Sequence, residues 1–218
     1  MLRYILHDIL SREKKYLRTK GQVIQTTDGQ KKFHLIVKGY VKRYLISNAG
    51  SLGVEVIYGP GDVFPLTLVY RELFNKEISS GPEVYYYEAM VDTEIHSISI
   101  ESLLEHIKQD PMVYKSLFLE AGTRLHSTLQ GLENVTLKSS YMRVAHQILF
   151  FAERFGVKTE AGVKVQLPLT HQDLADVLSV TRETVSNSMG ELRKKGLIKT
   201  NRHILIPSIK KLEDEVYS

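Results

Sequence analysis

The chain has 218 residues and a net charge of +4, since 29 lysines and arginines stand against 25 aspartates and glutamates. Its 43% of hydrophobic and 25% of charged residues are typical of a protein with a buried core, which argues against intrinsic disorder, and the length suits one large domain or two small ones. The absence of cysteine excludes disulfides, thiolate zinc sites, cysteine-ligated iron–sulfur clusters and cysteine nucleophiles.

The beginning of the chain does not resemble a targeting segment. Arg3, His7 and Asp8 interrupt the first ten residues before an apolar stretch reaches the length of a signal peptide. The longest purely apolar block, at 148–152, is far shorter than a membrane span. We therefore expect a cytoplasmic protein without a membrane partner.

From about Gly21 to Ile100 the sequence alternates between short β-rich runs and turn sequences. The turn residues Gly, Pro, Asn, Asp and Ser gather at 27–30, 47–50, 59–62 and 79–82. This spacing predicts a compact antiparallel sandwich or barrel. The predicted strands lie at 22–25, 33–37, 40–46, 53–58, 84–89 and 93–100.

Three consecutive tyrosines, Tyr85 to Tyr87, stand in one of these predicted strands. Two readings are open, since the rings can line a pocket for an effector or pack as ordinary core and surface residues. Alternation along a strand favours packing, with two rings on one face of the sheet and one on the other.

After Ile100 the pattern becomes helical, and from Pro111 an apolar seam repeats at steps of four and three residues. Such a seam packs along another helix, and we expect two copies of the chain to pair through it. The alternative is that the seam covers the chain's own β domain. A glycine in the seam would allow two helix backbones to approach closely. The predicted dimer interface consists of Phe118, Gly122, Leu125, Leu129 and Leu132.

A joint at 138–141 separates this helix from a second one, predicted at about 141–155 and ended by Gly156. The remainder, together with this second helix, forms a small separate domain. Positive charge is concentrated within it, because the segment 182–211 holds eight basic and two acidic residues.

The segment 169–198 has the pattern of a helix-turn-helix. Thr170 followed by Asp173 indicates a capping box at the start of a first helix, and a tight turn follows at Ser179 and Val180. Thr181 is expected to cap a second helix. Its inward face would consist of Val185, Met189 and Leu192, and its outward face of Arg182, Glu183, Ser186 and Asn187.

A helix with this polar outward face is suited to the major groove of double-stranded DNA. Arg182 can donate two hydrogen bonds to guanine, Glu183 can accept from cytosine, and Asn187 can pair with adenine. We expect these three residues and Ser186 to read bases. Threonines near the helix starts are expected to contact phosphates and set the register, namely Thr170, Thr181 and Thr184.

Downstream, 199–207 predicts a β-hairpin wing with Asn201, Arg202 and His203 at its tip. We expect Lys199, Arg202 and His203 to contact the DNA backbone, so that binding weakens steeply with salt. The basic run 193–195 has two open readings. It can contact phosphates directly, or it can be a solvated helix end that complements the helix dipole.

A β domain, a long helix and a winged helix-turn-helix in this order resemble the Crp/Fnr family of bacterial transcription regulators. The most specific similarity lies in the residues 181–185 and 196–198, with weaker support from turns at 35–39 and 59–62. The resemblance implies an α+β chain with an antiparallel, cyclic-nucleotide-binding-type β-roll at 1–110, a dimerisation helix at 111–138 and a DNA-binding domain at 139–218. It also implies a homodimer on a palindromic operator, with RNA polymerase as a candidate partner.

The chain departs from the effector sites of this family. Members that bind cyclic AMP have Gly-Glu shortly after the Gly-Asp turn, where this chain has Pro65 and Leu66, and an arginine further on, where it has Lys76 and Glu77. Cysteines for an iron–sulfur cluster are absent. His34, His96 and Met90 leave haem formally open, but without paired-ligand spacing.

We therefore expect no cofactor, and an effector, if one exists, that is an unidentified small molecule rather than cyclic AMP. A cyclic-nucleotide-responsive regulator with an atypical pocket remains an alternative. We expect no catalysis, because the sequence has no clustered histidines, phosphate loop or nucleophile motif. The other rival is a winged helix that binds protein instead of DNA, which would need an apolar exposed face on its second helix.

Overall fold

The computed structural model describes residues 2–26, 31–46, 50, 52–75, 84–136 and 139–217. The predicted turns at 27–30 and 79–82, most of the turn at 47–50, and the positions of Lys76 and Glu77 lie outside these residues. The chain forms two compact units, Met1–Leu125 and His126–Ser218. Helix α4 (Pro111–Thr136) contributes to both.

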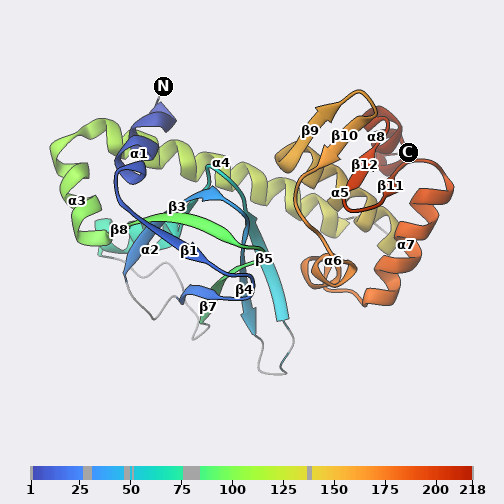
Figure 1. Ribbon diagram of the computed structural model, residues 1–218, viewed down its shortest axis with the longest axis horizontal. Helices are drawn as coiled ribbons and strands as arrows, with labels where there is room; N and C mark the ends of the chain where they lie inside the picture. Colours follow the sequence, from blue (N-terminus) through green and yellow to red (C-terminus); the bar gives the residue numbers. More distant parts are fainter. Residues whose placement is uncertain are drawn as a thin grey trace. The chain divides into compact units, whose positions relative to one another are not determined.

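The first unit contains two four-stranded antiparallel sheets, drawn in blue to green in Figure 1. All six predicted strands are present, and the expected antiparallel β domain is confirmed. The sequence did not predict β1, at the edge of the first sheet, or the two-residue β6 at its other edge. The first sheet has the order β1 (Lys14–Arg18), β8 (Thr93–Ser99), β3 (Lys32–Lys38), β6 (Val63–Phe64), and the second β2 (Val23–Thr26), β7 (Tyr85–Ala89), β4 (Val41–Ile46), β5 (Leu52–Tyr58).

Strand alternation distributes the three tyrosines of β7 over both faces of its sheet. Tyr87 is buried and stacks on Phe64, with ring centroids 5.1 Å apart. Tyr86 points the other way and stacks on Tyr44 at 5.3 Å. Tyr85 shares the face of Tyr87, since Arg43, which pairs with Tyr87, has its guanidinium 3.8 Å from the centre of the Tyr85 ring. The predicted two-to-one distribution of these rings is therefore confirmed.

Helices α1 (Leu2–Ser11), α2 (Leu66–Phe74), α3 (Ile100–Gln109) and the first turns of α4 share one apolar core with the first sheet. The sequence did not predict α1 and α2, whose short apolar repeats are difficult to distinguish from strands. Ser99 caps α3 by accepting a hydrogen bond from the Ser102 amide at 3.1 Å. The shared core includes Leu6, Leu10, Phe33, Val69, Leu103, Val113 and Leu117.

Two turns of the β domain depend on particular residues. Gly39 has φ +93°, and a Cβ there would lie 2.8 Å from the Thr93 Cα, so only glycine fits. In the turn that begins at Gly59, the Asp62 carboxylate accepts a hydrogen bond from the Gly59 amide at 2.8 Å. These are the turns in which the sequence resembles the family's β-roll.

The second unit combines a helical core with a small sheet of the order β11, β12, β10, β9. The sequence predicted α5, α6, α7 and the β11–β12 wing, but not the β9–β10 hairpin or α8. The elements are α5 (Ser140–Phe155), β9 (Gly156–Thr159), β10 (Gly162–Val165), α6 (His171–Leu178), α7 (Arg182–Lys194), β11 (Lys199–Thr200), β12 (Ile204–Ile206) and α8 (Ile209–Tyr217).

Gly156 ends α5 as predicted, and it does so in an extended conformation. Its φ is −85°, and it is already the first residue of β9. Glycine is needed because a Cβ would lie 2.1 Å from the Ala152 carbonyl oxygen and 2.6 Å from a Val163 methyl group. The chain can therefore leave the helix and enter the hairpin only where a side chain is absent.

Candidate nucleic-acid interface

The first helix of the helix-turn-helix begins at a complete capping box. The Thr170 hydroxyl accepts a hydrogen bond from the Asp173 amide at 3.1 Å, and the Asp173 carboxylate accepts from the Thr170 amide at 2.8 Å. Leu174, Ala175 and Leu178 are buried on the inner face of α6. The predicted capping box is confirmed.

The turn between α6 and α7 depends on Ser179, which adopts φ 53° and ψ 46°. This left-handed conformation is unfavourable for a residue with a Cβ. Arg143 of α5 stabilises the end of α6, since its guanidinium donates a hydrogen bond to the Leu178 carbonyl at 2.5 Å. The partners are 35 residues apart, so no local pattern reveals this contact.

Thr181 caps α7 as predicted, by accepting a hydrogen bond from the Thr184 amide at 3.1 Å. The inward face is also as predicted, with Val185, Met189 and Leu192 buried. On the outward face, the side chains of Arg182, Glu183 and Asn187 are exposed. The first two turns of α7 therefore present three polar side chains that can meet base edges.

The hydroxyls predicted at the interface already have partners within the protein. The Thr170 hydroxyl lies 2.6 Å from the Asp173 carboxylate, and the hydroxyls of Thr181 and Thr184 lie 2.8 Å apart. The Ser186 hydroxyl lies 2.9 Å from the Arg182 carbonyl. The hydroxyl protons of Thr170 and Ser186 are therefore used within the protein, as is one of the two protons of the Thr181–Thr184 pair.

The wing follows α7 as a β-hairpin, with Lys199 paired to Leu205 and Thr200 to Ile204. Lys199 and Arg202 are exposed, as a phosphate contact requires. His203 is half-buried, and its pKa is lowered by desolvation and by the nearby charges of Lys164 and Arg202. Near neutral pH it therefore adds no positive charge to the wing.

The basic run at 193–195 has three different environments. Arg193 donates a hydrogen bond to the Thr200 hydroxyl at 3.0 Å and so ties α7 to the wing. Lys194 is exposed. Lys195 forms ion pairs with Glu215 at 2.7 Å and with Glu191 at 3.2 Å. One residue of the three is thus left fully open to a phosphate.

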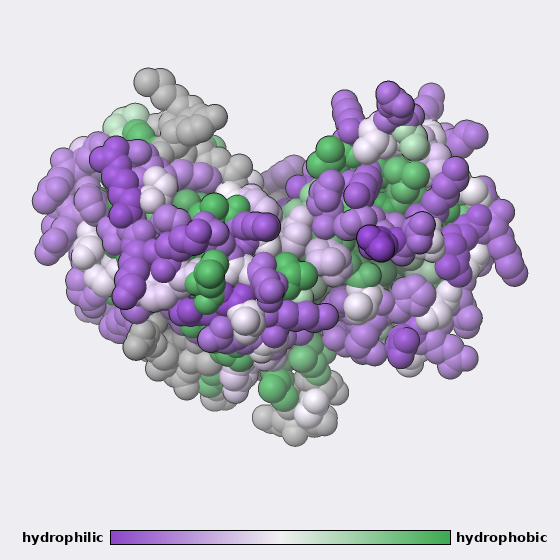
Figure 2. Space-filling view, viewed as in Figure 1, coloured by the Kyte–Doolittle hydropathy of each residue, from purple (hydrophilic) through white to green (hydrophobic). Residues whose placement is uncertain are grey.

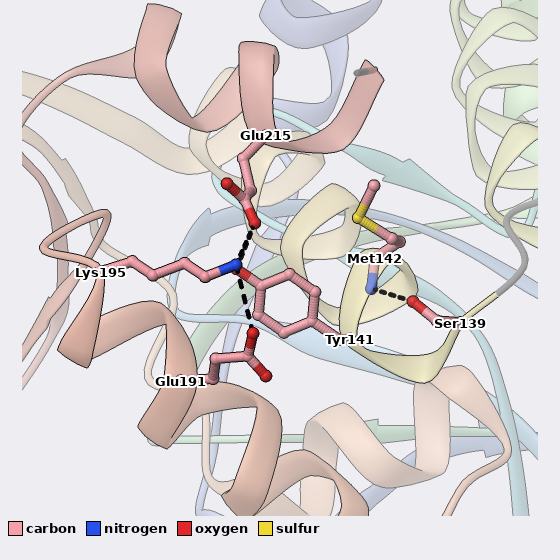
Figure 3. Close-up of polar contacts among 6 residues, drawn as sticks. All are labelled: Ser139, Tyr141, Met142, Glu191, Lys195 and Glu215. Atoms are coloured by element: carbon pink, nitrogen blue, oxygen red, sulfur yellow. Dashed lines mark hydrogen bonds and ion pairs between the residues drawn. The ribbon is translucent and has the colours of Figure 1, made fainter.

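Lys195 belongs to a cluster that joins the end of α7 to α5 and α8 (Figure 3). Its ammonium lies 4.6 Å from the centre of the Tyr141 ring, and the Tyr141 hydroxyl donates to Glu215 at 2.8 Å. Hydrogen bonds from Lys195 and Tyr141 lower the pKa of Glu215. Desolvation and the bond to Glu215 raise the pKa of Tyr141 to about 12. The cluster holds α7 against the first turn of α5.

The seam on α4 is unpartnered within a single chain. Phe118 is 74% exposed, Leu125 61%, Leu129 53% and Leu132 56%. A Cβ added to Gly122 would meet no other heavy atom within 4 Å. Because these side chains are so exposed, the alternative that the seam covers the chain's own β domain has no support.

The two candidate histidine ligands in the β domain have hydrogen-bond partners within the protein. Both ring nitrogens of the buried His34 have partners, Ser97 at 2.7 Å and Gln25 at 2.9 Å, and burial lowers its pKa to about 3. His96 is bonded to the Glu13 carbonyl at 3.0 Å. In the part of the chain that the structure describes, no three His, Cys, Asp or Glu side chains gather in a way that could hold a metal ion.

A small apolar hollow lies between α2 and α4 in the first unit. Pro65 is buried, and Leu66 lines the hollow. Both side chains are uncharged, so neither can form an ion pair with a phosphate. The hollow is lined by Leu66, Val69, Tyr70, Leu73, Tyr114, Leu117 and Phe118.

No described helix is both long and apolar enough to cross a membrane.

The family model of a Crp-like helix-turn-helix domain matches residues 142–215. A global nitrogen regulator from Nostoc sp. is 23% identical over 80% of this chain and 76% of its own length. A CRP-like cAMP-activated global transcriptional regulator from Mycobacterium tuberculosis is 25% identical, over 83% and 78%. The structure of FixK2 from Bradyrhizobium japonicum is similar with a TM-score of 0.75 and 23% identity, covering 92% of this chain and 96% of that one.

The fold, with an antiparallel β domain followed by a winged helix-turn-helix, is that of a two-part transcription regulator. Residues 142–215 match a Crp-like helix-turn-helix domain, and over most of its length the chain is similar to regulators of the Crp/Fnr family, as the resemblance in its sequence implied.

Proposed function

We propose that the chain is a sequence-specific DNA-binding regulator that acts as a homodimer on a palindromic operator. The observation that carries this proposal is the polar, exposed face of α7, formed by Arg182, Glu183 and Asn187. With 13 residues, α7 is about 20 Å long, which suits the major groove. Arg182 reads guanine, Glu183 accepts from cytosine, and Asn187 pairs with adenine.

The phosphate contacts come from the residues around this helix. Lys199 and Arg202 of the wing neutralise phosphates, while the helix starts at Thr170 and Thr181 offer backbone amides. Ser186, Thr184 and His203 belong to the same surface, with Ser186 next to the bases. Counterion release then makes binding strongly dependent on salt.

Dimerisation through the α4 seam places two such helices on one operator. Phe118, Gly122, Leu125, Leu129 and Leu132 pair with their copies across a twofold axis, and the half-sites lie about one helical turn apart. We assign 1–110 to a sensor-type β-roll, 111–138 to the dimerisation helix and 139–218 to the DNA-binding domain. An effector acts only if it binds two arrangements of these domains with different affinities.

The alternative of a protein-binding winged helix is disfavoured by the same surface. Of the large hydrophobic side chains that are exposed, none lies on α6, α7 or the β11–β12 wing, all of which the structure describes in full. The surface over α7, at the right of Figure 2, is mainly hydrophilic. A protein-binding groove would need an apolar anchor there.

The test is selection from a random DNA library at two salt concentrations, with Arg182→Ala and Lys199→Ala compared with the unmodified chain. We expect a palindromic consensus. Arg182→Ala relaxes the preference at one base pair of each half-site, whereas Lys199→Ala weakens binding to all sequences and reduces the salt slope by about one per chain. The control is Lys108→Ala, which changes an exposed lysine of α3 and should leave the base preference and the salt slope unchanged. If no sequence is enriched, the proposal is wrong.

A further inference from the structure

His171 is not among the residues that the sequence pattern assigned to DNA binding, yet it contacts one of them. It is the first residue of α6, and its Nδ1 lies 2.8 Å from the Ser186 hydroxyl on α7. The same hydroxyl lies 2.9 Å from the Arg182 carbonyl one turn earlier. Ser186 is thus held from both sides, by its own helix and by the preceding one.

These two contacts decide what Ser186 can offer to a base. A hydroxyl has one proton to donate and two lone pairs that accept. If His171 carries its proton on Nδ1, that N–H donates to Ser186, and the hydroxyl proton goes to the Arg182 carbonyl. If the proton is on Nε2, the hydroxyl donates to Nδ1. In both tautomers the hydroxyl proton is used inside the protein.

His171 is neutral near pH 7, because desolvation and the charges of Arg193 and Arg182 lower its pKa. A neutral ring has one donor and one acceptor nitrogen, as the two arrangements above require. Both His171 and Ser186 are half-buried, so water competes with their bond less than at a fully exposed site.

We propose that His171 is a positioning residue that makes Ser186 an acceptor-only contact and thereby sets base preference at one position of each half-site. This inference rests on the proposed function. An acceptor facing the major groove selects the amino groups of cytosine and adenine, and it disfavours guanine O6 and N7 and thymine O4. Without His171, only the Arg182 carbonyl still fixes the hydroxyl, which can then rotate away from it and donate to those base acceptors as well.

The experiment uses fluorescence anisotropy to measure binding of the full chain to the consensus operator and to operator variants. In these variants each base pair of the half-site is replaced, one at a time, by each of the three others. The variants are His171→Ala, His171→Asn, Ser186→Ala and the double variant His171→Ala with Ser186→Ala. Asparagine places an amide N–H near the position of Nδ1. Thermal unfolding of each variant shows whether the helix-turn-helix remains folded.

We expect His171→Ala to reduce the preference at one base pair by about two- to tenfold, the range of one neutral hydrogen bond. His171→Asn restores the preference, and His171→Ala has no effect on it when Ser186 is already alanine. An equal loss of affinity for all operator variants would mean that His171 is merely structural, and an unchanged preference would overturn the inference. If the unmodified chain itself shows no preference, the proposed function fails instead.

Discussion

Replacing Leu129 with alanine is expected to weaken dimerisation by about thirtyfold. Leu129 is 53% exposed in a single chain, so pairing across the seam can bury about half of its side chain. Full burial of a leucine is worth about 1.5–3 kcal/mol, which gives about 1 kcal/mol for this half. Each dimer contains two copies of Leu129, related by the twofold axis, so the free energy of dimerisation falls by about 2 kcal/mol. This corresponds to about a thirtyfold increase in the dissociation constant.

Sedimentation velocity over a range of concentrations measures this dissociation constant. The matched control is Thr123→Ala, which changes an exposed residue of α4 outside the seam and should leave the constant unchanged. Alanine favours helix, so α4 itself is retained in both variants, and circular dichroism checks this. Unchanged self-association of the Leu129→Ala chain, with its helix intact, would refute the argument that the exposed seam is a dimer interface.

Three further predictions concern the second unit. Ser179→Gly should raise the free energy of unfolding by about 0.5–1 kcal/mol, as measured by chemical denaturation. Glycine adopts φ 53° without the strain that a Cβ causes, and the greater entropy of its unfolded chain offsets only part of this gain. A decrease would show that the Ser179 side chain stabilises the turn. Gly156→Ala should lower the free energy of unfolding by about 2 kcal/mol or more, because the new Cβ would lie 2.1 Å from the Ala152 carbonyl oxygen. A loss below about 0.5 kcal/mol would contradict the tight packing at this glycine. Glu215 has a lowered pKa in the folded chain, so it stabilises the fold above its unfolded pKa of about 4.5, and this contribution is lost as the pH falls through the folded value. Glu215→Gln should therefore lower the thermal midpoint at pH 7, and lower it progressively less as the pH falls below about 4.5. An effect that does not change with pH over this range would contradict the ion pair with Lys195.

Elements with strong local signals were predicted from the sequence. The six strands of the β domain, α7 and the wing combine periodicity with turn or capping residues, and the capping box at Thr170 and Asp173 is present as expected. The elements that were not predicted are short segments whose few apolar residues fit more than one period, namely α1, α2, α8, β1, β6 and the β9–β10 hairpin. Gly156 shows the same limit, because its residue type predicted the end of α5 but not the close approach of Ala152 and Val163 that requires a glycine there.

The sequence by itself determined the kind of surface that this protein presents. The order of its elements, the polar residues at the start of α7 and the apolar repeat on α4 can be read from neighbouring residues along the chain. Only the tertiary structure decided what each polar group is free to do. Lys195 pairs with Glu215, Arg143 with Leu178, and His171 with Ser186, across separations of 20, 35 and 15 residues. Hydrogen bonds and ion pairs form over about 3 Å in space, so chain folding alone brings such partners together.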